Sequence, residues 1–172
     1  MDGDIPQIES CSEKEVYAFY GLAAYCAQVF EHAALNLALV LRLPGVDAVS
    51  QDLFDDLYYS LGKQTLGRLF HAAKKEVEIQ EYDLGYIEEA VELRNILVHH
   101  FFRTHAEDFV SEAGRMEMMK ELQLMISKLK QADTLMERIY APLWDKYGVT
   151  EKYIEREMEQ MQQRALHRDA SL

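Results

Sequence analysis

The stretch AVELRNILVHHFFRTH, residues Ala90–His105, sets the helical pattern on which the rest of the chain can be placed. On an α-helix each residue turns by about 100°. With Arg94 at zero, the apolar residues of this region gather within roughly 80° of it on both sides: Ile87, Ala90, Val91, Leu97, Val98, Phe101 and Phe102. The spacing therefore predicts a helix with one apolar face and places Arg94 near the middle of that face.

Polar side chains lie on and beside this apolar face. A charged group such as Arg94 is very costly to bury unless it is paired or faces a polar surface. Asn95, His99 and Arg103 follow one another at steps of four residues, so they form a polar ridge along the face. The position of an arginine and a histidine on and beside an apolar face therefore needs an explanation.

The periodicity leaves two interpretations of these residues open. In the first, His99 is a histidine of the core and Arg94 forms a buried ion pair with one of three acidic residues: Glu31, Glu88 or Glu89. In the second, Arg94 and His99 belong to a functional site. The two interpretations differ in what a substitution of Arg94 should change, the stability of the fold or an activity.

The length and composition suit one globular domain with a sizeable core. Of the 172 residues, 49% are hydrophobic and 28% are charged, and only 8 Gly and 3 Pro predict few turns and long helices. Cys11 and Cys26 show neither a disulfide framework nor a metal-binding spacing. No signal peptide and no membrane-spanning run is visible, so we expect a cytoplasmic protein without a membrane partner.

The net charge of −12 counts against a broad nucleic-acid surface, because such surfaces replace phosphate counterions with Lys and Arg. Any contact with RNA must then be local and weak. Arg94 and Arg103 could supply a small basic cleft, especially if two copies of the chain meet and double it.

Capping and periodicity patterns divide the chain into helices. Ser12-Glu13-Lys14-Glu15 is a capping box, and Leu43-Pro44-Gly45 ends the helix that follows it. Ser50 and Ser111 are typical N-caps, and Gly148 is a natural stop. The expected helices cover about 13–41, a broken second helix in two pieces at 51–61 and 64–76, then 84–109, 112–147 and 151–164.

This order of elements predicts an all-α fold, an up-and-down four-helix bundle over residues 12–147. An additional amphipathic helix at 150–168 is expected to pack on the bundle or on a partner. The dipeptide Glu31-His32 lies in the middle of the first helix, where it is either solvated or points at Arg94 and His99. The methionines of the fourth helix are expected to fill the core: Met116, Met118, Met119 and Met125.

The segment from Arg94 to His99 resembles the signature of HEPN domains. Arg94-Asn95-Ile96-Leu97-Val98-His99 fits the pattern R-x4-6-H with a polar residue directly after the arginine. Thr65-Leu66-Gly67-Arg68-Leu69 is similar to the T-L-G-x-L that precedes the motif in some of these proteins. The resemblance covers roughly residues 15–140.

The resemblance implies a module of four or five helices that cleaves RNA without a metal, as many HEPN proteins do. It implies a homodimer whose two motifs meet in one composite cleft, and a toxin or defence role held in check by an antitoxin-like protein. Some members of the family only bind RNA or a protein. A non-catalytic helical module that binds a protein partner is therefore the alternative function.

The two motif residues suit RNA cleavage chemically. A base must take the proton of a ribose 2′-OH, and a cation must stabilise the charge on the phosphate oxygens. Histidine works near neutral pH and arginine grips phosphate with two donors, so we assign these tasks to His99 and Arg94. Asn95 could orient His99 or contact phosphate, and Arg103 and His100 are candidate RNA contacts.

No cofactor or metal is expected. His99 and His100 point about 100° apart on a helix and cannot easily share one metal ion. Glycine-rich phosphate loops, zinc-binding helices and nucleophile elbows are absent from the sequence.

Overall fold

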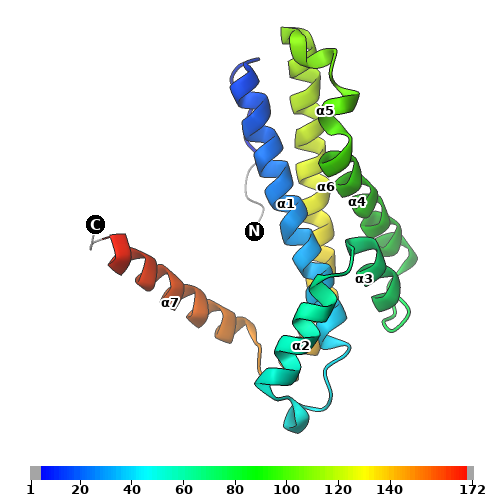
Figure 1. Ribbon diagram of the computed structural model, residues 1–172, viewed down its shortest axis with the longest axis vertical. Coiled ribbons are helices and arrows are strands. Elements are labelled where there is room, and N and C mark those ends of the chain that lie inside the picture. Colours follow the sequence, from blue (N-terminus) through cyan, green and yellow to red (C-terminus); the bar gives the residue numbers. More distant parts are fainter. Residues whose placement is uncertain (1–4, 170–172) are drawn as a thin grey trace.

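The computed structural model describes residues 5–169, and within this range every element of regular secondary structure is a helix. Three long helices, α1 (Glu13–Val40), α4 (Glu81–His99) and α6 (Glu112–Asp145), run side by side (Figure 1). The short helices α2 (Gln51–Gly62) and α3 (Leu66–Ala73) cover one end of α1, and α5 (Phe101–Thr104) follows α4. Single 3₁₀ turns at Val46–Ala48 and Asp108–Val110 and a last helix, α7 (Glu151–Asp169), complete the chain. The predicted helical bundle is thus confirmed, with α2 and α3 as the broken second helix.

The helix starts follow the predicted caps. The side-chain hydroxyls of Ser12, Ser50 and Ser111 accept hydrogen bonds from backbone N–H groups three residues later, at 3.3, 3.2 and 3.0 Å. Each bond satisfies an N–H that the helix leaves without an acceptor. Gly148 adopts the left-handed backbone (φ 78°), which ends α6 as expected and is accessible to glycine at little cost.

The core lies mainly between α1 and α6. Small residues of α1, among them Ala23, Ala27 and Ala34, are fully buried and let the two helix backbones approach closely. Their partners on α6 are long and apolar: Met118, Leu122, Met125, Ile126 and Leu129. The methionines Met118, Met119 and Met125 are therefore core filler, as predicted, and Met116 is half-buried.

The third long helix is shorter than the sequence predicted. It was expected to continue to Phe109, but α4 ends at His99 because His100 leaves the helical conformation (φ −131°, ψ −23°). The bend lets Phe102 and Phe109 lie against Tyr17 of α1, with ring centroids 5.8 and 5.6 Å apart. The start of α4 also differs, since Gln80 rather than a residue near Asp83 precedes it and no side chain caps it.

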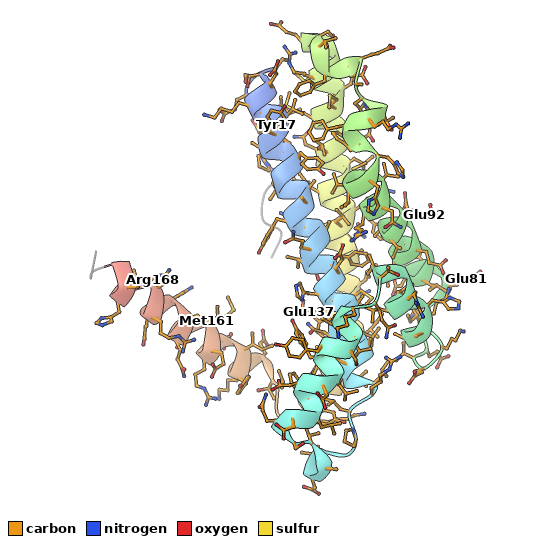
Figure 2. All side chains as sticks on the ribbon, in the orientation of Figure 1. Tyr17, Glu81, Glu92, Glu137, Met161 and Arg168 are labelled. Atoms are coloured by element: carbon orange, nitrogen blue, oxygen red, sulfur yellow. The ribbon has the colours of Figure 1, made fainter. Side chains whose placement is uncertain are left out.

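Helix α7 extends away from the bundle (Figure 1). Side chains such as Met161 and Arg168 lie far from the three long helices (Figure 2). Its large apolar residues are all exposed, at 42% to 69%: Tyr153, Ile154, Met158, Met161 and Leu166. The bundle in this structure therefore does not cover α7, and packing on a partner stays a prediction. No helix in the described range is long and apolar enough to cross a membrane.

Candidate functional site

Arg94 lies between α1 and α4 and is held by two neighbours. Its Nε donates to Glu31 Oε1 of α1 in an ion pair, and its Nη1 donates to Asn95 Oδ1 at 3.0 Å. The side chains of Arg94 and Glu31 are 21% and 32% exposed. The predicted need for a partner is confirmed, and Glu31 is the partner among the three acids considered. Glu31 also points at the motif, as one interpretation of the Glu31-His32 pair proposed.

The position of Arg94 in the apolar face is less central than its wheel angle indicated. Ile87, Ala90 and Leu97 are buried, but Val98, only 40° from Arg94 on an ideal wheel, is 44% exposed. The buried face is thus rotated away from Val98, and Arg94 lies at its border. The side of α4 that carries Val98 is therefore open to solvent beside Arg94.

His99 is exposed near the carboxyl end of α4. Its ring makes an edge contact with His100 at 6.2 Å between centroids. Among the residues that the structure describes, no hydrogen bond or ion pair involves either ring nitrogen of His99. The interpretation of His99 as a core histidine is therefore wrong, and its imidazole is accessible to a ligand.

Arg94 and His99 do not face one another within one chain. Five residues along a helix correspond to roughly 140° of rotation and about 7.5 Å of rise. The break at His100 also interrupts the predicted ridge, so Arg103 lies on α5 and no longer continues the row of Asn95 and His99. Arg103 and His100 are both exposed and remain available as RNA contacts. The Tyr20 hydroxyl donates to the Leu97 carbonyl at 3.3 Å and fixes this part of α4 against α1.

A cleft adjoins the Arg94–Glu31 pair on the side of α2 and α3. Its volume is about 390 Å³, and Glu31 forms part of its wall. The other polar and aromatic wall residues are His32, Tyr58, Tyr59, Lys63 and Gln64. The sequence pattern singled out Glu31, His32 and the segment near Thr65-Leu66-Gly67, but not Tyr58, Tyr59, Lys63 or Gln64 as parts of one cleft, because the corner between α2 and α3 forms through tertiary packing.

A second histidine, His105, has a structural role that the sequence pattern did not reveal. Its Nδ1 lies 2.8 Å from Asp108 Oδ2, and its Nε2 lies 3.1 Å from Glu121 Oε2 of α6. Its ring also packs on Phe101 at 4.7 Å between centroids. Both nitrogens are engaged, so His105 joins the chain after α5 to α6. The i, i+3 spacing of His105 and Asp108 was the local signal that could have suggested it.

Two carboxylates of α6 lie along an open groove between α1 and α6. Burial, and secondarily the charge of Glu137, raise the pKa of Asp133. Burial, with Glu137 and Asp133, raises the pKa of Tyr140 to about 12. The groove contains a hollow of about 850 Å³. It lies on the face of α1 and α6 that α4 does not cover, so it is separate from Arg94 and His99.

No protein-family model, no curated protein and no solved structure matches this chain. Within residues 5–169, no three His, Cys, Asp or Glu side chains lie together in a way that could hold a metal ion. The assignment of a function therefore depends on the geometry around Arg94 and His99.

Proposed function

We propose that the chain is a metal-independent endoribonuclease of the HEPN type, with a toxin or defence role. The observation that carries the proposal is the state of Arg94. Glu31 and Asn95 hold two of its nitrogens, while Nη2 has no protein acceptor in the described range. A guanidinium that is held in place but still has a free N–H donor group is suited to bind a phosphate oxygen.

The reaction assigns one task to each side chain. His99 takes the proton from a ribose 2′-OH, the 2′ oxygen bonds to phosphorus, and the bond from phosphorus to the 5′ oxygen breaks. The leaving oxygen receives a proton from water or from a protonated histidine. Arg94 stabilises the charge on the non-bridging oxygens, with Glu31 and Asn95 as positioning residues. The products are a 2′,3′-cyclic phosphate and a 5′-OH.

The separation of Arg94 and His99 on α4 favours a cleft made by two copies of the chain. In such a homodimer, Arg94 of one copy and the partner subunit's His99 act on the same phosphate. The open α1–α4 face, where Val98 lies one helical turn after Arg94 and is 44% exposed, is the surface on which the copies meet. Arg103 and His100, at the end of this face, then contact the flanking phosphates.

The first experiment measures cleavage of a labelled RNA and thermal unfolding on the same variants. Arg94→Ala and His99→Ala should each lower the rate by at least about 100-fold, with the helical content unchanged. EDTA should have no effect, and the products should end in a 2′,3′-cyclic phosphate. Arg138→Ala and His71→Ala, at exposed sites outside the α1–α4 face, are matched controls that should cleave like the parent. A parent chain that does not cleave RNA, combined with an Arg94→Ala variant that only loses stability, would contradict the proposal.

A mixing experiment tests the composite cleft. Arg94→Ala and His99→Ala chains, each inactive alone, form mixed dimers in which one of two sites regains both residues. An equal mixture should recover about a quarter of the parent rate, because half of the dimers are mixed and half of their sites are intact. No recovery would show that both residues must come from one chain.

A second candidate function is a non-catalytic module that binds a protein, such as an antitoxin-like regulator. The exposed apolar stripe of α7 favours it, because a contiguous row of exposed apolar side chains marks an interaction surface. Expression of the chain in a bacterial host separates the two functions. Growth arrest relieved by Arg94→Ala indicates the nuclease. Growth arrest relieved instead by Met158→Gln with Met161→Gln indicates binding through α7.

A further inference from the structure

The cleft beside Glu31 has the dimensions and the wall chemistry of a small-ligand site. It lies where the chain turns between α2 and α3 and closes against α1. Its volume of about 390 Å³ falls in the range that small-molecule sites occupy. Buried Leu69 and Leu35 contribute apolar wall, so the inner part of the cleft is apolar and its rim is polar.

Two tyrosines at the rim of the cleft expose aromatic surface to solvent. Tyr58 and Tyr59 are 38% and 69% exposed, and their rings meet edge to face at 6.3 Å between centroids. Phe54 stacks behind Tyr58 at 6.4 Å and 10° between planes, which holds that ring in place. A flat aromatic ring held in this way at the rim of an apolar cleft is a platform for a planar ligand.

Polar groups at the same rim fit the rest of a nucleotide. Lys63 follows the last residue of α2 and makes no ion pair among the described residues, so its ammonium can donate hydrogen bonds to a phosphate. Gln64 has an amide that can pair with the edge of a base, and His32 lies on the α1 side of the cleft. A stacking ring, an amide and a cation together match a nucleobase and its phosphate.

We propose that this cleft is a subsite for one nucleotide of single-stranded RNA, with the base on Tyr58 and Tyr59 and a phosphate at Lys63. The inference deepens the proposed nuclease function and rests on it for the nature of the ligand. Glu31 links the two sites, since one side of it forms the cleft wall and its carboxylate pairs with Arg94. A nucleotide bound here therefore lies beside the phosphate that Arg94 binds.

Single-stranded RNA is favoured over a duplex, because a base can only stack on a tyrosine once it has left its own stack.

The net charge of the chain limits the affinity for RNA. Asp55 and Asp56 lie on α2 and the net charge is −12, so affinity comes from stacking and one or two phosphate contacts. The subsite thus selects an unpaired nucleotide next to the cleaved bond.

The test measures binding without cleavage. The probe is a fluorescent five-nucleotide RNA with 2′-O-methyl groups, which cannot undergo 2′-OH attack, and anisotropy is read with the full-length chain. Tyr58→Ala and Tyr59→Ala should each weaken binding about 5- to 150-fold, the range found when a stacked base loses its ring. Lys63→Ala should also weaken binding, because it removes the cation at the phosphate. Tyr58→Phe should bind like the parent. Tyr82→Ala and Lys75→Ala, exposed residues outside the cleft, are matched controls that should also bind like the parent.

The outcomes separate this inference from the nuclease proposal. Loss of probe binding in the cleft variants, with no cleavage of the unmodified RNA by the parent, supports the subsite and overturns the nuclease. Cleavage by the parent with unchanged binding in the cleft variants overturns the subsite alone. No binding by the parent, or equal binding of an abasic probe of the same length, also overturns it. Tyr59 is exposed, so its substitution should leave the melting temperature unchanged and binding changes can be assigned to the site.

Discussion

At the scale of single residues, the ion pair of Arg94 and Glu31 serves both interpretations that the sequence left open. It ties α1 to α4, as a structural pair does, and it positions a guanidinium at an exposed border of the apolar face. A partly buried pair of this kind is more strongly coupled than a surface pair, because solvent screens it less. Stability and activity can therefore both depend on Arg94.

A double-mutant cycle on this pair should show strong coupling. Arg94→Ala leaves Glu31 half-buried without its cation and should cost about 1–3 kcal/mol of unfolding free energy. Glu31→Gln with Arg94→Ala should cost less than the sum of the single changes, with a coupling of about 1 kcal/mol or more. Urea unfolding measures all four proteins. The more exposed pair Lys74–Glu88 is the matched control and should couple by less than about 1 kcal/mol.

Asp133 should make stability depend on pH. Burial, and then the charge of Glu137, hold the folded pKa of Asp133 above the ordinary value of an aspartate, which it has in the unfolded chain. The contribution of Asp133 is thus fully present below that value and is lost as the pH rises through the raised folded pKa. Asp133→Asn should therefore raise the melting temperature at pH 7 and change it little at pH 3. Glu137→Gln should give part of the same gain. An equal effect of Asp133→Asn at both pH values would contradict this account.

At the scale of elements, the break after α4 shapes both the site and the end of the bundle. His100 leaves the helix, Phe102 and Phe109 turn onto α1, and His105 attaches the following segment to Glu121 of α6. The exposed imidazole of His99 therefore lies at the end of a rigid helix rather than in its middle.

Gly114 should be essential for this arrangement. It is buried in the first turn of α6, and a Cβ there would meet the backbone oxygen and Cα of Asp108, which cannot move aside as a flexible side chain would. Gly114→Ala should lower the unfolding free energy by about 1–3 kcal/mol. Gly21→Ala, in the exposed interior of α1 with no atom near the added carbon, should instead raise it by up to about 1 kcal/mol. A Gly114→Ala protein as stable as the parent, measured in urea, would show that the turn at Asp108 is adjustable.

At the scale of the whole molecule, acidity opposes association. Each chain carries a net charge of −12, so two copies repel one another, and the proposed binding of RNA would depend on the few cations near α4 and the α2–α3 corner. Exposed apolar residues on the α1–α4 face must overcome that repulsion if the composite cleft forms.

The predicted homodimer should therefore strengthen with salt. Raising NaCl from about 0.02 M to about 0.5 M shortens the range of the repulsion and should lower the dissociation constant in sedimentation experiments. Val98→Asp, at the exposed α1–α4 face, should weaken the dimer, and Val110→Asp, at an exposed turn outside this face, should not. A monomer at every concentration and salt level would remove the composite cleft, and with it the mixed-dimer recovery of activity.

Local rules made much of the fold predictable from the sequence. The hydroxyls of Ser12, Ser50 and Ser111 and the left-handed Gly148 mark helix ends through groups at most a few residues away. The spacing of apolar residues in α1 and α6 also predicts which face of each helix is buried, because residues three or four apart are neighbours on a helix surface. The need of Arg94 for a partner was predictable for a similar reason, because a charge beside an apolar stripe must be paired.

Contacts between distant segments decided the rest. Which acid pairs with Arg94 depends on the alignment of α1 with α4, and the cleft at Tyr58 and Lys63 exists only because α2 and α3 fold against α1. The end of α4 at His99 and the attachment of His105 to Glu121 also come from packing across the bundle. The helical pattern of a sequence gives the angle of each side chain around the axis of the helix to which it belongs. The distance to another helix is fixed only when their apolar faces are buried together, so these features required the tertiary structure.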